Sequence, residues 1–284
     1  MTPLDPSGDL WTSGGAIFAI AMFLFAAGLS QASSTLARRA SVPAFALAMG
    51  IGVAWFSASP WFGAIAAVAW LAFPLVQMTH GLLKVRVARH RELSPTLTYA
   101  AEFAELRDRS KEWEEQGFEI IDDCELHPGE PSQVFRFLIA PDHRHLVTLG
   151  WISQGPWILT YSAVSSWGQD GRHWMTWNYP LPYGLKTAPD VCLWRCLSAD
   201  ASDALLGAHL ELLRLNDVAP MARPDLSEPE GARAAWLAFI HRQLEHNLNV
   251  GWLHTVDGGR QVAYSFRGLL GAFSQFFVTL LETR

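Results

Sequence analysis

Four side chains in the middle of the chain could bind a metal ion. Cys124, His127, His143 and His145 supply the sulfur and imidazole ligands that Zn²⁺ prefers. His143 and His145 are two residues apart, so on a strand both rings would point to one face. The stretch "PDHR" is typical of a turn, however, and no Cys/His pair has the spacing of a zinc motif. We therefore predict no metal site and no cofactor.

General acid–base chemistry is a second possibility, with His143, His145 or His173 as the base. The sequence contains no Gly-x-Ser-x-Gly, no Gly-rich phosphate loop followed by Lys-Ser/Thr and no dinucleotide fingerprint. Three residues separate Cys192 from Cys196, which is not the Cys-x-x-Cys redox spacing, and we expect reduced thiols. No catalytic residue is predicted, and an enzyme of unknown class remains an alternative.

Aromatic residues gather around one predicted hairpin, "SSWGQDGRHWMTWNYP", residues 165–180. Strand alternation places Trp167 on the face that Trp157 shares, and it places Trp174 and Trp177 on opposite faces of the next strand. Cross-strand packing under covering helices is the leading interpretation. A pocket for a flat or lipidic ligand and a subunit contact are the alternatives. The candidate interaction residues are Trp157, Trp167, Trp174, Trp177, Phe273, Phe276 and Phe277.

Short runs of alternating hydrophobicity after Gly117 predict the sheet that carries these residues. Connections such as "SQGP" and "GQDG" are short and rich in turn residues, which favours an antiparallel meander of about six strands. The strands are expected at residues 118–126, 134–140, 145–153, 156–167, 172–179 and 191–197.

Amphipathic helices are expected to cover this sheet. A polar helix over roughly 97–116 precedes the strands. A second helix starts near Asp200, with an apolar stripe formed by Ala204, Leu205, Ala208, Leu212 and Leu215. A third helix opens at "SEPE", where Ser227 and Glu230 have the spacing of a capping box, and Gly251 ends it. Its stripe consists of Ala232, Ala235, Trp236, Phe239, Ile240, Gln243 and Leu244.

The end of the chain combines a predicted hairpin with an apolar helix. The hairpin turns at Asp257-Gly258-Gly259. The helix, residues 268–281, contains no charged residue and is too short to span a bilayer. Burial in the core is the leading interpretation, and docking on the membrane surface or on a partner subunit is the alternative.

Two long uncharged runs predict membrane-spanning helices. Residues 14–36 are enough for one span, and residues 42–83, interrupted by "SASPW", are enough for two joined by a proline turn. A cleaved signal peptide is disfavoured because Asp5 and Asp9 precede the first run where a basic segment would be expected. Lys and Arg are retained on the cytoplasmic side, so the N-terminus is predicted outside and the C-terminal domain inside. The orienting residues are Arg38, Arg39, Lys84, Arg86, Arg89 and Arg91.

Charge differs between the two parts of this 284-residue chain, whose formal net charge is −6. Residues 1–92 hold six Lys/Arg and three Asp/Glu, whereas residues 93–284 hold fifteen against twenty-four. Nucleic acid is therefore not an expected partner, because its affinity depends on cationic side chains. The predicted organisation is a short extracytoplasmic N-terminus (1–13), a three-helix transmembrane region (14–83), a basic juxtamembrane linker (84–97) and a cytosolic α+β domain (98–284).

These features predict a multi-pass protein of a bacterial inner (plasma) membrane. Uncharged spans rich in small residues, an apolar last helix and abundant tryptophan favour a non-enzymatic accessory or scaffold subunit of a larger membrane complex. Its expected partners are the lipid bilayer and either membrane protein subunits or further copies of this chain. A membrane-anchored ligand-binding or sensory domain that uses the aromatic-faced sheet is the alternative.

Overall fold

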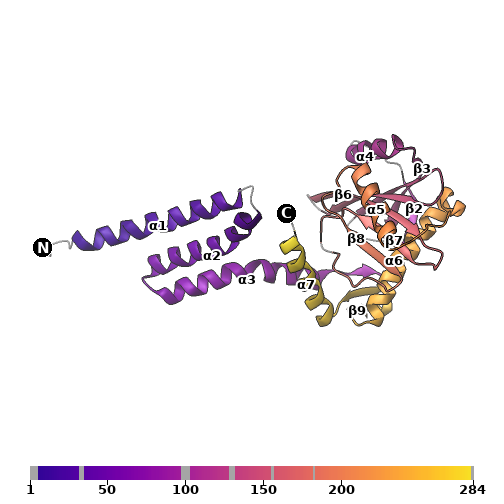
Figure 1. Ribbon diagram of the computed structural model, residues 1–284. Coiled ribbons are helices and arrows are strands. Elements are labelled where there is room, and N and C mark those ends of the chain that lie inside the picture. Colours follow the sequence, from indigo (N-terminus) through magenta and orange to yellow (C-terminus); the bar gives the residue numbers. More distant parts are fainter. Residues whose placement is uncertain are drawn as a thin grey trace. The chain divides into compact units, whose positions relative to one another are not determined.

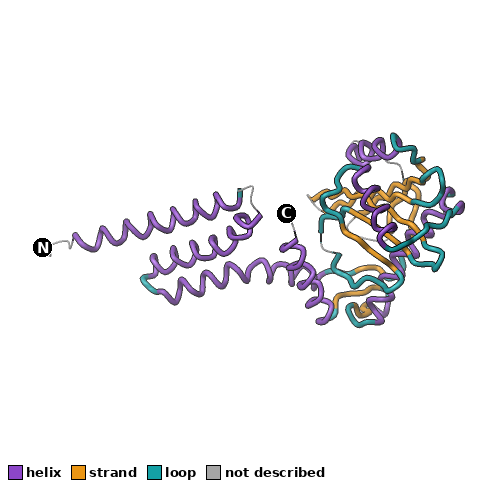
Figure 2. The backbone as a smooth tube through the Cα atoms, in the orientation of Figure 1, coloured by secondary structure: helices purple, strands orange, loops and turns teal. Residues whose placement is uncertain are grey.

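The computed structural model describes residues 6–31, 35–96, 103–127, 132–154, 157–181 and 183–282 (Figure 1). The chain divides into two compact units, Met1–Lys84 and Val85–Thr283. The first unit is helical, and the second combines helices and strands (Figure 2).

Three helices form the first unit: α1 (Pro6–Ser30), α2 (Thr35–Ser57) and α3 (Pro60–Lys84). The predicted proline turn lies between α2 and α3. Among the described residues, two stretches, Ala40–Ser57 and Pro60–Lys84, are long and apolar enough to cross a membrane, while the apolar part of α1, Phe18–Ser30, is shorter. The prediction of three spans is therefore not confirmed. The side chains of Arg38 and Arg39 lie outside the described residues.

Seven strands form the main sheet of the second unit, in the order of the sequence. They are β2 (Glu92–Pro95), β3 (Glu119–His127), β4 (Ser132–Ile139), β5 (Leu146–Gln154), β6 (Trp157–Trp167), β7 (His173–Trp177) and β8 (Val191–Arg195). All six predicted strands are present, so the α+β class and the sheet are confirmed. The seventh strand, β2, lies in the stretch predicted as a linker. The last pair, β7 and β8, is parallel, contrary to the predicted meander, because the long connection 178–190 returns the chain to the same end of the sheet.

Helices cover both faces of this sheet. α6 (Pro229–Asn249) packs on one face, which we call the α6 side, and its Trp236 contacts Phe135 and Phe137. α4 (Ala104–Glu114) and α5 (Ser202–Leu215) pack on the opposite face, the α5 side. Alternate strand residues supply the two cores, so β6 directs Tyr161 to the α6 side and Val164 to the α5 side.

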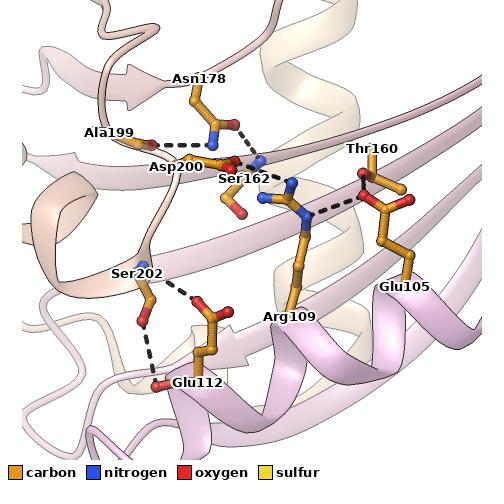
Figure 3. Close-up of polar contacts among 9 residues, drawn as sticks. All are labelled: Glu105, Arg109, Glu112, Thr160, Ser162, Asn178, Ala199, Asp200 and Ser202. Carbon is orange, nitrogen blue, oxygen red and sulfur yellow. Dashed lines mark hydrogen bonds and ion pairs between the residues drawn. The ribbon is translucent and has the colours of Figure 1, made fainter.

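Polar contacts fix the segment that leads into α5 (Figure 3). Arg109 Nη2 on α4 lies 3.0 Å from Asp200 Oδ1. The Asn178 amide accepts a hydrogen bond from the Ser162 N–H at 2.7 Å and donates one to the Ala199 carbonyl at 3.1 Å. The start of α5 is thereby tied both to α4 and to the sheet.

Two details of the covering helices correct the sequence predictions. Ser227 does not cap α6, because it belongs to a short 3₁₀ helix, η2 (Pro224–Ser227), where its hydroxyl donates to the Pro224 carbonyl at 2.6 Å. Glu228 is the N-cap, without a side-chain hydrogen bond, so the predicted capping box is wrong. On α5, Ala204 and Leu215 are exposed. The buried residues of α5 are Ser202, Leu205, His209, Leu212 and Leu213.

A small second sheet and the last helix complete the second unit. The sheet has the order β1 (Val87–Ala88), β10 (Gln261–Tyr264), β9 (Leu253–Val256), and a 3₁₀ turn, η3 (Asp257–Gly259), joins β9 to β10 where the hairpin was predicted. α7 (Phe266–Glu282) follows β10 directly. Its Gly268 lies against Trp252, since a Cβ atom there would be 2.0 Å from the Trp252 carbonyl oxygen.

Candidate ligand-binding site

A cavity of about 490 Å³ lies on the α6 side, where β6 and β7 meet the segment 221–225. Two backbone hydrogen bonds place this segment. The Met221 N–H donates to the Trp167 carbonyl, and the Arg223 N–H donates to the His143 carbonyl, each at 2.8 Å. The cavity is therefore bordered by strand ends, a hydrogen-bonded segment and one helix.

A pair of stacked rings forms one wall. Trp167 and His173 face each other across the β6–β7 ladder, and their rings are nearly parallel, with centroids 4.7 Å apart. Phe239 from α6 meets His173 edge-on at 5.3 Å. Direct cross-strand pairing brings the two rings together, and the helix fixes the orientation of the histidine.

Small residues of α6 form the opposite wall. They are spaced by three or four positions, so they lie on one helical face. Ala234 and Ala238 on this face are exposed, which shows that the cavity is open to solvent. Gly231 permits the close approach of α6 to η2, since a Cβ atom there would be 1.8 Å from the Asp225 carbonyl oxygen. The small lining residues of α6 are Gly231, Ala234, Ala235 and Ala238.

Two arginines bring positive charge to the cavity. The Arg223 guanidinium lies over the Trp167 ring, 4.8 Å from its centroid, and its Nε is 3.2 Å from Asp225 Oδ1. Arg242 Nη1 is 2.9 Å from Asp190 Oδ2. The lining thus contains two guanidinium groups and one carboxylate, although the surrounding sequence is acidic. An anion is the ligand that this charge favours.

His173 is the buried polar group of the site. The residue is 3% exposed, and within the described part of the chain its Nε2 atom is buried without a hydrogen-bond partner. Burial first, and then the charges of Arg242 and Arg223, lower the pKa of His173 to about 3. The ring is therefore neutral at physiological pH and a weak base, and its Nε2 atom forms no hydrogen bond within the described part of the chain.

The structure separates the predicted aromatic residues. Trp167 lines the cavity, Trp177 packs with Tyr179 on the α6 side, and Trp174 lies on the α5 side against Leu212 and Leu213 of α5. Phe273 and Phe276 are half-buried on α7. The side chains of Trp157 and Phe277 lie outside the described residues.

The four metal-ligand candidates are also apart. Cys124 is buried in the core of the α6 side, where burial raises the pKa of its thiol. His127 Nε2 is 3.6 Å from Glu125 Oε2, and His143 Nδ1 is 3.0 Å from the Ser227 hydroxyl. Within the described residues, no group of three or more His, Cys, Asp or Glu could hold a metal ion.

A second histidine cluster was not foreseen from the sequence. On the α5 side, the Ser166 hydroxyl lies 2.7 Å from His145 Nδ1 and 2.8 Å from His209 Nε2, and Thr176 Oγ1 lies 3.1 Å from His209 Nδ1. Burial first, and then the neighbouring His145 and His173, lower the pKa of His209 to about 3. Both ring nitrogens of His209 have partners, so this chain of hydrogen bonds attaches α5 to β6 and β7.

Comparison of the chain with protein-family models, with curated proteins and with solved structures gives no significant match. The interpretation of the cavity therefore depends on its own geometry.

Proposed function

We propose that this chain is a membrane-anchored protein whose C-terminal unit binds a small organic anion in the cavity beside α6. The observation that carries the proposal is that His173, whose buried Nε2 atom has no partner among the described residues, lines the cavity. A buried polar atom without a hydrogen bond is costly, by about 1–3 kcal/mol, and a ligand that bonds to it removes this cost.

The lining favours a carboxylate or phosphate attached to an apolar body. Arg223 and Arg242 offer N–H donors to an acidic headgroup. Phe239 and the small residues of α6 offer apolar surface to the rest of the ligand. Because the pKa of His173 is lowered to about 3, its ring is a weak base, and we assign it to ligand recognition, which favours a ligand-binding or sensory function over an enzyme.

The proposed anchor lies in the inner (plasma) membrane. α2 and α3 have the length and composition of membrane spans. We assign the third span to α1, with the N-terminus outside and the C-terminal unit in the cytoplasm. Basic residues near the start of α2 and after the end of α3 support this orientation, because both ends of this helix pair would lie on the cytoplasmic side. They are Arg38, Arg39, Lys84, Arg86, Arg89 and Arg91.

Calorimetric titration of the purified full-length protein tests ligand binding, with benzoate, hexanoate and inorganic phosphate as separate probes. We expect at least one of them to bind. Ala238→Trp fills the open side of the cavity and should abolish binding. Arg223→Gln removes a charged donor and should weaken binding about tenfold. Ala204→Trp changes an exposed alanine on α5 and should bind like the wild type.

Two results would contradict the proposal. One is equal binding by the wild type and by Ala238→Trp. The other is the absence of binding by every probe, together with the absence of any organic acid in mass spectra of protein purified from its native membrane.

An accessory subunit of a membrane complex is the second candidate function, favoured by an apolar groove of about 330 Å³ between α1 and α2. Its lining includes Phe23, Leu24 and Phe56, all exposed, together with Gly52. A helix of a partner subunit or of a second copy fits such a groove, because small residues permit close helix approach.

Purification from native membranes in mild detergent tests the second candidate. We expect stoichiometric partners with the wild type and their loss with Gly52→Ile. Gly81→Ile is the matched control, since a Cβ atom at Gly81 meets nothing within 4 Å. A monomer in several mild detergents would exclude the accessory function.

A further inference from the structure

α7 turns an apolar stripe away from the protein. Phe266, Leu270 and Val278 are 78%, 56% and 48% exposed, and Ser274, also exposed, lies between the last two. Each of these four positions follows the one before by four residues, so they form a ridge that winds slowly around the helix. Leu269, in contrast, is buried. An exposed apolar stripe of this kind marks a surface that something covers.

A polar side chain holds the inner side of α7. The Gln275 amide donates a hydrogen bond to the Leu185 carbonyl at 2.9 Å and accepts one from the Gly184 N–H at 2.8 Å. Gly271 packs on the ring of Trp252, since a Cβ atom there would be 2.3 Å from it. α7 is therefore fixed with its exposed apolar stripe outward.

The start of α7 lies at the end of the small sheet where the second unit begins. β1 and β10 are antiparallel, with Val87 opposite Val262. Val87 is the third residue of the second unit, which begins at Val85. α7 begins two residues after Tyr264. Val85 follows α3 directly in the chain, so the second unit begins where an α3 span would leave the bilayer.

Charge at this end of the unit suits an anionic surface. Arg86 and Arg267 are exposed there, and Arg267 Nη1 donates to the Val250 carbonyl at 3.0 Å. α7 contains no acidic residue before Glu282, although residues 93–284 hold more acidic than basic residues. Basic residues beside an apolar helical stripe are typical of helices that lie on anionic lipid.

We propose that α7 lies on the anionic cytoplasmic surface of the membrane, with the stripe of Phe266, Leu270 and Val278 in the boundary between headgroups and acyl chains. The proposal rests on the membrane anchor of the proposed function and is independent of the cavity. It assigns the exposed stripe to lipid rather than to a partner subunit.

Electron paramagnetic resonance of the full-length protein in nanodiscs tests this contact. A nitroxide is placed at Ser274→Cys in a background with Cys192→Ser and Cys196→Ser, and its collision rates with oxygen and with a water-soluble nickel chelate are compared. In a phosphatidylcholine–phosphatidylglycerol mixture, we expect the nitroxide to collide more often with oxygen than with the nickel chelate. This preference for oxygen should weaken in phosphatidylcholine alone. Phe266→Ser combined with Leu270→Ser should abolish the preference.

Two control positions separate the possible failures. Val68→Cys, on α3, reports the anchor, and Ala204→Cys, exposed on α5, reports a water-facing helix. Oxygen preference at Val68 with nickel preference at Ser274 overturns the α7 proposal and leaves the anchor intact. Nickel preference at both positions overturns the anchor and the α7 proposal together. Dipolar broadening between Ser274 labels, independent of lipid charge, assigns the stripe to a second copy and also overturns the proposal.

Discussion

The two faces of the main sheet each bury a histidine whose pKa is lowered to about 3, but the two rings differ in their partners. On the α5 side, His209 contacts Ser166 with one ring nitrogen and Thr176 with the other. On the α6 side, His173 lines an open cavity, and its Nε2 atom has no partner within the described part of the chain. Similar burial thus accompanies a closed hydrogen-bond network on one face and an open position on the other.

This difference separates a structural histidine from a recognition histidine. A buried polar group with complete hydrogen bonds rigidifies the fold, because it joins elements that are distant in sequence. A buried polar group with a missing bond costs stability unless a ligand supplies the bond. The lowered pKa alone does not distinguish the two histidines, whereas the hydrogen-bond partners of their ring nitrogens do.

Replacing each histidine with leucine should give the largest contrast. We expect His209→Leu to lower the free energy of unfolding by about 3 kcal/mol, because the Thr176 hydroxyl loses its partner and Ser166 loses one of two. His173→Leu should stay within about 1 kcal/mol of the wild type, since the Nε2 atom that it removes has no partner. Urea unfolding followed by circular dichroism measures both changes. Equal losses of stability would erase the distinction.

Acidification should destabilise the protein through both histidines. Their folded pKa of about 3 is below the ordinary value of 6.5, so between these pH values the unfolded state binds more protons. Stability should therefore fall as pH falls below 6.5, by up to about 1.4 kcal/mol per pH unit for each ring. Unfolding free energies between pH 7 and pH 5 measure the slope. A bound anion should reduce the contribution of His173, because a nearby negative charge raises the pKa of the ring.

The result at Ala238→Trp decides whether that reduction comes from the cavity. A probe that binds the wild type should not change the slope of unfolding free energy against pH in this variant, because the variant does not bind it. A probe that flattens the slope of both proteins would act elsewhere.

Strand alternation predicted the two faces of the sheet correctly. The pattern of β6 and β7 separated Trp174 from Trp177, and the structure places them on opposite sides. The pattern also put Trp167 and His173 on directly paired strands, but their stacking depends on the register of the hairpin, which the alternation alone does not fix.

The two histidine sites were harder to predict because each needs a helix placed by tertiary packing. His209 follows Leu205 by four residues, so helical spacing could have assigned it to the buried stripe of α5. The predicted stripe included Leu205 and Leu212, which are buried, but it left out His209 and contained Ala204 and Leu215, which are exposed. For the cavity, Ala235 was correctly assigned to core packing, but it also lines the cavity, and nothing local in the sequence shows which part of the sheet stays uncovered.

Removing a hydroxyl from each face should give the smallest contrast. Thr176→Val leaves His209 Nδ1 without its partner, so we expect a loss of about 1 kcal/mol. Thr148 faces the α6 side, and its Oγ1 is buried without a partner in the described part of the chain. Thr148→Val should therefore be neutral or stabilising, since the two side chains have nearly the same shape and the valine buries no hydroxyl. Urea unfolding of the two variants at neutral pH measures this pair. A loss at Thr148 as large as that at Thr176 would show that the Thr148 hydroxyl forms a stabilising hydrogen bond, and it would weaken the case for unsatisfied polar groups on the α6 side.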